Sequence, residues 1–344
     1  MTPRERFQAV MNFLPFDRLP VLEWAGWWKQ TTDRWHTEQL PADLTDRYDI
    51  CRHFGLEIYL QDWFRIRGPG CPAPESHGAG IMKTEAEYEA LREHLYPWPV
   101  IDRERWTSWA EQQERGEVVL WFTVEGFFWF PRTLFGIESH FYAFYDHPDL
   151  MHRINQDLTD WILKVIKELG SICSPDFATF AEDMSYNHGP MLSEDLFNEF
   201  MKPYYEQVNP ALHDLGILSI VDSDGDISVP ASWFENVGVE GMLPLERQSG
   251  VDVAALRETH PTMRFLGHFD KMTMNRGEAA MRAEFERLLP TAAKGGLIVG
   301  CDHQTPPGVS YQDYQLYLSL FREYAAEAGR MSRRRGDSGE TAHR

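Results

Sequence analysis

The stretch that decides the fold is residues 193–226, which read SEDLFNEFMKPYYEQVNPALHDLGILSIVDSDGD. Ser193, with two acidic residues behind it, is typical of a helix N-terminus, and Gly216 is typical of a residue that ends a helix. We therefore predict a helix over Ser193–Leu215. The apolar run at 217–222 predicts a buried strand that ends in an acidic loop.

The same alternation of helix-like and strand-like segments repeats along the chain, as expected for parallel strands joined by crossover helices. Further helices are predicted at Pro148–Leu169, Arg276–Lys294 and Ser310–Glu327. Eight strands are predicted, at about residues 19–23, 55–62, 117–124, 177–181, 217–222, 240–245, 263–267 and 296–301. Eight parallel strands close a barrel, so the predicted fold class is α/β, a single (β/α)8 TIM barrel over residues 1–330. The polar segment 331–344 is predicted to be a disordered tail.

Composition and charge exclude several classes of protein. The chain of 344 residues is 43% hydrophobic and 25% charged, which suits a globular protein with a sizeable core. Its formal net charge of -20 repels nucleic acid and anionic lipid. No apolar run approaches the roughly 20 residues that a membrane span needs, and the N-terminus lacks the apolar core of a signal peptide. We expect a cytoplasmic protein that binds a small molecule, with no nucleic-acid or membrane partner, and leave open a homodimer.

Functional residues of a (β/α)8 barrel collect where strands end, and here those positions are strongly acidic. Candidate catalytic residues are Glu182, Glu246, His268, Asp270 and Lys271. Candidate substrate-binding residues are Glu23, Trp24, Trp63, Glu125, Asp183, Tyr186 and Gln248. Lys and Arg are almost absent from these positions, with Lys271 as the exception. A single carboxylate at a strand end can equally be the cap of the next helix, so each assignment competes with that structural role.

Converging carboxylates repel one another unless they are protonated, paired or bound to a metal. Asp222 and Asp224 leave their strand on the same side, and Cys301 and His303 follow the last predicted strand. Together they are candidate ligands for zinc or another divalent metal. The segment Asp222–Asp226 is not an EF-hand, because glycine does not occupy the sixth position and Trp233 stands where the bidentate Glu is needed.

Several of these segments are similar to those of a known superfamily, that of uroporphyrinogen decarboxylase and the cobalamin-linked methyltransferases. The resemblance rests on Pro3–Phe7, Phe16–Val21, Glu182–Met184, Asp222–Asp226, Pro244–Glu246, Gly267–Lys271 and Gly300–His303 followed by Pro306-Pro307. It covers most of the chain and implies a (β/α)8 barrel. It also implies either decarboxylation or methyl transfer, the latter with zinc and with a corrinoid on a carrier protein.

Two departures bear on the activity that the resemblance implies. The decarboxylases carry an arginine-rich segment after the first strand, where this chain has Leu22–Lys29, with Glu23 in place of cationic donors. The methyltransferases bind zinc through a His-x-Cys pair and a later Cys, and here Asp222 and Asp224 stand for the pair while Cys301 matches the last ligand.

The leading hypothesis is a metal-assisted, corrinoid-linked methyltransferase acting on a small molecule, rather than a true porphyrinogen decarboxylase. The alternatives are a metal-independent decarboxylase or lyase that uses the carboxylates as proton donors, and a non-catalytic partner of a corrinoid protein.

Overall fold

The computed structural model describes residues 1–337, and it is a mixed α/β structure with a seven-stranded sheet. The strands of this sheet follow the order β1-β2-β3-β6-β7-β8-β9, and the pairs β2–β3, β3–β6 and β8–β9 are parallel. They are β1 Ile58–Trp63, β2 Val118–Glu125, β3 Phe177–Ala181, β6 Leu218–Asp222, β7 Gly241–Leu243, β8 Arg264–Phe269 and β9 Leu297–Cys301. A separate antiparallel hairpin joins β4, Ser185–Tyr186, to β5, Gly189–Pro190.

The chain forms two compact units. Unit 1 contains residues 1–60, 112–119 and those from Met242 onward, and unit 2 contains residues 61–111 and 120–241. The helices that lie wholly in unit 1 are α1 Pro3–Met11, α2 Lys29–Glu38, α3 Arg47–Phe54, α12 Val253–Thr259, α13 Glu278–Ala292 and α14 Tyr311–Asp337. Helix α5, Arg103–Glu114, begins in unit 2. The other helices of unit 2 are α4 Glu85–Leu91, α6 Trp129–Phe135, α7 Ile137–Asp146, α8 Pro148–Gly170, α9 Glu194–Phe200, α10 Lys202–His213 and α11 Pro230–Glu235.

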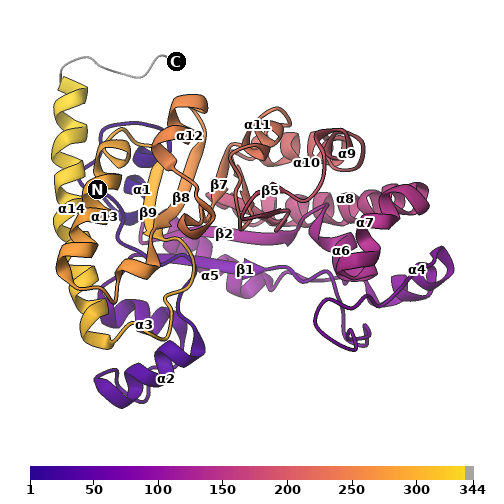
Figure 1. Cartoon of the computed structure of the whole chain (residues 1–344), viewed down its shortest axis with the longest axis horizontal. Helices are drawn as coiled ribbons and strands as arrows, with labels where there is room; N and C mark the ends of the chain where they lie inside the picture. The colour runs from indigo at the N-terminus through magenta and orange to yellow at the C-terminus, as the bar shows by residue number, and fades with distance from the viewer. Residues whose placement is uncertain (338–344) are drawn as a thin grey trace. The chain divides into compact units, whose positions relative to one another are not determined.

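In unit 1 the two ends of the chain pack together. Helix α1 lies beside β9, α13 and α14 (Figure 1), and the amide of Gly296, just before β9, donates to the carbonyl of Val10 over 2.6 Å. A capping box starts α1, because the Thr2 hydroxyl accepts from the Glu5 amide and the Glu5 carboxylate accepts from the Thr2 amide. The N-terminal and C-terminal segments of the sequence therefore build one core.

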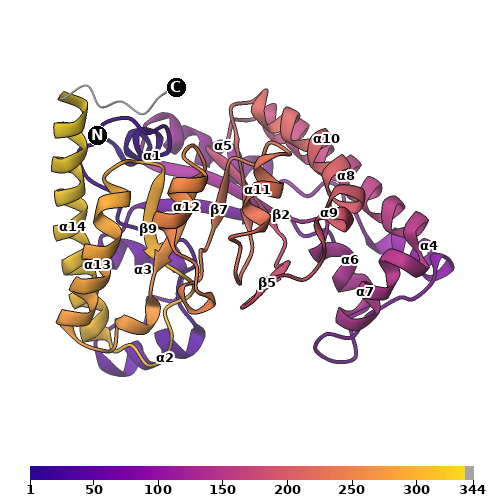
Figure 2. The ribbon, with the colours of Figure 1, turned by 45° about the horizontal axis from the view of Figure 1, so that its top comes forward.

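In unit 2 the long helix α8 packs beside α10 (Figure 2). The Asn155 side chain donates to the Phe200 carbonyl over 2.7 Å, and His152 Nδ1 lies 2.8 Å from the Tyr204 hydroxyl. Strand β2 is buried along its whole length, as its continuous apolar run requires.

The sequence-based helix boundaries differ from the structure at one informative place. The predicted helix Ser193–Leu215 is two helices, α9 and α10, separated at Met201. Pro203 favours the break, because it has no amide hydrogen and its fixed φ suits the first turn of a helix, where it lies in α10. Ser193 caps α9 as predicted, accepting from the Leu196 amide, and Gly216 adopts a left-handed φ of 69°.

Seven of the eight predicted strands are present, and the first, at 19–23, is not a strand. Pro20 has no amide hydrogen for a ladder, and the amide of Leu19 donates to Ala325 on α14. The Val21 carbonyl still accepts from Glu57, next to β1, over 2.8 Å. The segment thus touches a sheet strand without forming regular ladder hydrogen bonds.

At the C-terminus, α14 continues through Asp337, so residues 331–337 are helical where a tail was expected. The remainder of that predicted tail lies outside the described residues. Within residues 1–337, no helix has the length and apolar character needed to cross a membrane.

Candidate active site

Two arginines leave β1 on the same side of the chain. Beyond Trp63, burial alternates along the chain, with Phe64 and Ile66 each 1% exposed while Arg65 is exposed and Arg67 half-buried. Arg65 lies over the Trp63 ring, with its guanidinium carbon 3.8 Å from the ring centroid. Arg67 is held by a 2.7 Å hydrogen bond from Nη2 to the Thr133 carbonyl.

Glu125 ends β2 beside these arginines. It is 9% exposed, and its Oε2 is buried with no hydrogen-bond partner among the described residues. Burial raises the pKa of Glu125, while the charges of Arg65 and Arg67 and a hydrogen bond from Trp129 oppose that rise. Glu125 is therefore a buried carboxyl group whose pKa is raised by burial and lowered by the nearby arginines, with burial the larger effect.

Helix α6 supplies the opposite wall. Trp129 and Arg132 are three residues apart, which places both on one face of the helix, and the Arg132 guanidinium lies 5.2 Å from the Trp129 ring centroid. Arg132 Nη1 donates to the Asp183 carbonyl over 3.1 Å. Burial lowers the pKa of Arg132 and the charge of Asp183 opposes this, but a guanidinium remains charged at any physiological pH.

The Gly- and Pro-rich segment 68–81 forms another wall of the same space. We call residues 74–82 the strap. The amide of Ile137 donates to Gly78 over 2.9 Å, and the amide of Ile81 donates to Leu134 over 2.7 Å. The strap is thereby fixed to the turn between α6 and α7.

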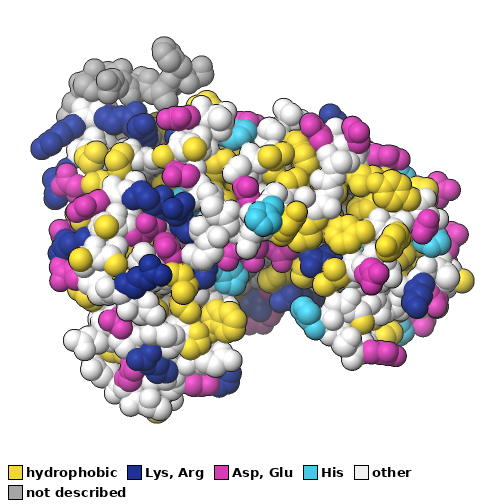
Figure 3. Space-filling view, in the orientation of Figure 1, with side chains coloured by type: hydrophobic (Ala, Val, Ile, Leu, Met, Phe, Trp, Pro, Cys, Tyr) yellow, Lys and Arg dark blue, Asp and Glu magenta, His cyan; other side chains and the backbone are white. Residues whose placement is uncertain are grey.

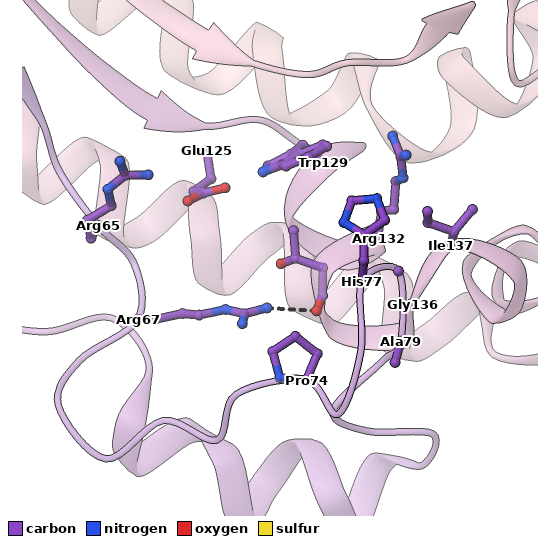
Figure 4. A pocket seen from close by; sticks show the side chains of 12 residues that line it. Arg65, Arg67, Pro74, His77, Ala79, Glu125, Trp129, Arg132, Gly136 and Ile137 are labelled. Carbon is purple, nitrogen blue, oxygen red and sulfur yellow. Dashed lines mark hydrogen bonds between the residues drawn. The ribbon is translucent and has the colours of Figure 1, made fainter. Parts of the chain in front are cut away.

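These elements line a pocket of about 410 Å³ in unit 2, open to solvent on one side, which we call the arginine pocket. In Figure 4, Arg65 and Arg67 lie on one side and Arg132 and His77 on the other, with Glu125 and Trp129 between them. The lining comprises Arg65, Arg67, Pro74, His77, Gly78, Ala79, Glu125, Trp129, Arg132, Thr133, Gly136 and Ile137. The lining thus contains three guanidinium groups and one carboxyl group, and the charges of Arg65 and Arg67 act on that carboxyl group. Concave sites with apolar walls and a few convergent charges are the usual places where small ligands bind.

Glu182, expected to act in catalysis, instead anchors the chain before α6. Its carboxylate accepts from the amides of Phe127 and Phe128 over 2.8 Å each, from Trp129 over 3.2 Å, and from the Tyr205 hydroxyl. Burial raises its pKa to about 7, and these donors oppose the rise.

Of the other expected residues of unit 2, Trp63 ends β1 beneath Arg65, and the rest lie around the acidic loop after β6. The amide of Asp224 donates to the Asp183 carboxylate over 3.3 Å, and burial and the charges of Asp183 and Asp224 raise the pKa of Asp222 well above its usual range. Tyr186, 49% exposed, packs edge-on against His188. Of the expected site residues, only Glu125 lines the arginine pocket.

In unit 1 the structure brings a second set of expected residues together around Lys271. Its ammonium contacts Glu246 Oε1 at 3.4 Å, Asp302 Oδ1 at 3.2 Å, and Gln248. Gln248 in turn donates to Asp270 over 2.8 Å. The charges of Asp302 and Glu246 raise the pKa of Lys271, against the effect of its own burial. This group is an ion-paired cluster with its one cation neutralised.

His268, Glu23, Trp24 and Cys301 are buried in unit 1. Both ring nitrogens of His268 are engaged, as Nδ1 lies 2.8 Å from the Leu245 carbonyl and Nε2 accepts from the Val253 amide over 3.1 Å. Trp24 Nε1 donates to the Cys301 carbonyl over 2.7 Å. Burial raises the pKa of Glu23 to about 8, with the nearby Tyr314 and Tyr317 hydroxyls and the charge of Arg47 opposing it, and burial raises the pKa of Cys301 well above its usual range.

The residues do not fit the expected metal site. Through residue 337, no three His, Cys, Asp or Glu side chains gather closely enough to hold an ion. Cys301 would have to lose its proton to bind zinc, and its burial opposes that loss. His303 is half-buried and follows the buried Asp302.

The pocket residues that the sequence analysis missed are the arginines. The statement that Lys271 is the only clear cation at the strand ends is wrong, because Arg65 and Arg67 follow β1 directly. The signal was their alternation with Phe64 and Ile66, which continues the period of the strand and puts both arginines on one side.

The comparisons with known proteins agree with the expected superfamily. The family model of uroporphyrinogen decarboxylase (URO-D) matches residues 114–324, more than half of the chain. The chain belongs to the URO-D family. A search of curated proteins found no significant match.

Among solved structures, a methyltransferase from Methanosarcina mazei has a TM-score of 0.64 and 16% identity, with 94% of this chain and 98% of that chain covered. An endo-1,4-beta-mannanase from Eisenia fetida has a TM-score of 0.43 and 10% identity, covering 90% of this chain and 91% of its own. At 16% identity, the match to the Methanosarcina mazei methyltransferase shows that the two proteins share a fold, and it shows nothing about activity.

Proposed function

We propose that this URO-D family protein is a metal-independent carboxy-lyase that acts on a small carboxylate in the arginine pocket. The observation that carries the proposal is the convergence of Arg65, Arg67 and Arg132 with the buried Glu125 in one cavity. Arginine holds carboxylates through paired, charge-assisted hydrogen bonds. A carboxyl group whose pKa is raised by burial is suited to donate a proton near neutral pH.

In the proposed reaction the bond between the substrate carbon and its carboxylate breaks, and carbon dioxide leaves. The bonding electron pair stays on the carbon, which takes the proton from the Glu125 carboxyl, and solvent then returns a proton to Glu125. The arginines orient the substrate. Trp129 and Ile137 provide an apolar surface that would surround the carboxylate as it becomes neutral carbon dioxide.

The test first identifies a carboxylic acid that the unmodified protein decarboxylates. The reaction is then run in D2O with the unmodified protein, and kcat is compared with that of a Glu125→Gln variant. We expect one deuterium on the product carbon, and a fall in kcat of about 100-fold or more in the variant, because a positioned general acid contributes at least that much. The Kd of the substrate should change little. A variant with full activity would exclude Glu125 as the proton donor.

A second candidate is the metal-assisted, corrinoid-linked methyltransferase, in which zinc or another divalent metal binds at Asp222 and Asp224 of unit 2. One observation favours it: Asp222 is buried beside two further carboxylates, and a cation would relieve their repulsion. Metal analysis of purified protein, with a methyl-transfer assay that includes a corrinoid carrier protein, separates the two candidates. A metal-free preparation with full activity excludes the second.

Porphyrinogen decarboxylation is not part of the proposal. A cavity of about 410 Å³ suits a small ligand and not a tetrapyrrole with its acidic side chains. We expect no coproporphyrinogen from uroporphyrinogen. Rapid formation of that product would show that the arginine pocket is not where the reaction takes place.

A further inference from the structure

We infer that the arginine pocket selects a dicarboxylate, with one acid group on each of its two cationic walls and a flat apolar spacer between them. This inference rests on the proposed function for the location of the site, and it adds the class of ligand.

The charge of the lining sets how many acid groups the ligand needs. The lining contains three guanidinium groups and one carboxyl group, so its net charge is +2 if Glu125 is ionised and +3 if it is protonated. A single carboxylate therefore leaves the lining with a net positive charge. Two carboxylates neutralise the pocket when Glu125 is ionised.

The first wall has guanidinium donors available for a carboxylate. Arg65 makes no hydrogen bond to any residue in 1–337, and stacking on Trp63 at 3.8 Å holds its guanidinium. Arg67 is positioned by its bond to the Thr133 carbonyl, which uses Nη2. A guanidinium fixed by one contact loses less freedom when it binds an anion.

The second wall is Arg132, with His77 on the strap beside it (Figure 4). The hydrogen bond from Arg132 Nη1 to the Asp183 carbonyl fixes the direction of this side chain. Since the two walls lie on different sides of the pocket, they suit two separated acid groups rather than one compact dianion such as a phosphate ester.

The space between the walls is apolar and has an aromatic side. The Trp129 ring, Pro74, Ala79 and Ile137 border it. A flat ring can stack on the indole, so an aromatic spacer fits better than a hydroxylated chain.

The experiment is calorimetric titration of the full chain with terephthalate, benzoate and phenyl phosphate. The variants are Arg65→Gln and Arg132→Gln, with Arg153→Gln as the control because Arg153, on the surface, pairs within residues 1–337 with Glu85 and Glu89. Each variant changes the net charge equally. Thermal unfolding checks that all three fold.

We expect terephthalate to bind at least about tenfold more tightly than benzoate. The ratio of the two Kd values should fall toward one in Arg65→Gln and Arg132→Gln but stay unchanged in Arg153→Gln. Equal binding of terephthalate and benzoate overturns the inference. So does tighter binding of phenyl phosphate than of terephthalate, or an equal effect of Arg153→Gln. If the expected binding pattern is found but no dicarboxylate loses carbon dioxide, the proposed reaction fails and this inference stands.

Discussion

His268 is a buried imidazole held between two backbone groups that cannot exchange roles. The Leu245 carbonyl can only accept and the Val253 amide can only donate, so Nδ1 carries the hydrogen and Nε2 accepts. Arg287 Nη1, 3.1 Å from Nε2, also requires an acceptor there. The ring is therefore neutral, and burial lowers its pKa from 6.5 to about 4. Its place in the structure explains why a histidine at a strand end need not serve catalysis.

That lowered pKa predicts how stability changes with pH. The unfolded chain takes up the proton near pH 6.5 and the folded chain near pH 4, so the contribution of His268 is complete above pH 6.5 and is lost as the pH falls to about 4. The full loss is about 3 kcal/mol. Urea unfolding of the unmodified protein and of His268→Gln between pH 7 and 4 measures it. Parallel curves for the two proteins would contradict the assignment.

Glu182 predicts a change in stability with little change in ligand binding. In Glu182→Gln the new amide group faces backbone amides that need an acceptor, so we expect a loss of roughly 2 kcal/mol or more in the free energy of unfolding. Tyr205→Phe removes one of the four donors and should cost about 1 kcal/mol. Chemical denaturation gives both values. If Glu182→Gln were as stable as the unmodified protein, the carboxylate would not be holding the turn before α6.

At the scale of elements, the wall of the arginine pocket depends on close contact between two glycines. Gly136, between α6 and α7, has φ 84° and ψ 163°, a region that side chains avoid, and a Cβ on it would lie 2.4 Å from the amide nitrogen of Gly80. The strap and the α6–α7 turn can approach this closely only without side chains.

We therefore expect Gly136→Ala to lower the free energy of unfolding by more than about 3 kcal/mol, or to displace the strap and abolish terephthalate binding. The matched control is Gly216→Ala, also in unit 2. Its φ is 69°, but a Cβ there meets nothing within 4 Å, so only the conformational cost of about 1 kcal/mol applies. Denaturation and calorimetry measure both effects. Equal costs for the two variants would show that the contact with Gly80 is unimportant.

The elements also show how far the sequence could be interpreted. Helix α8 was predicted within one residue, because a strong apolar period and an N-terminal proline mark it. The missing first strand was not foreseeable from its apolar pattern, since strand pairing depends on partners that are distant in the sequence.

The candidate site was predictable only in part, for a physical reason. Glu125 was found because a carboxyl group at a strand end stands out, whereas Arg132 lies inside α6 and reads as an ordinary helical residue. Which carboxylates face solvent and which anchor backbone amides, as Glu182 does, is decided by tertiary packing.

At the scale of the whole molecule, a net charge of -20 surrounds a cationic pocket. On the face shown in Figure 3, acidic and basic side chains are interspersed, and pairs such as Arg282 with Glu323 form between neighbouring helices. Local ion pairs therefore offset part of the repulsion among acidic side chains. The acidic side chains in excess of the basic ones still repel one another.

This arrangement predicts opposite responses to salt. Raising the ionic strength screens the repulsion among acidic groups, so Tm should rise by a few degrees between about 20 and 200 mM KCl. The same change weakens the attraction of terephthalate to the arginines and should raise its Kd several-fold. Thermal unfolding and calorimetry in matched buffers test the pair. A Tm that falls with KCl would contradict the first half, and a constant Kd the second.

The stacked arginines have one more consequence. The guanidinium groups of Arg65 and Arg132 lie 3.8 and 5.2 Å from the indole rings of Trp63 and Trp129. A cation over an indole alters its excited state, and an anion that draws the guanidinium away should change the wavelength and intensity of emission. Occupancy of the pocket would then be visible as intrinsic fluorescence, without a dye or label, and Trp63→Phe and Trp129→Phe would each remove the signal from one wall.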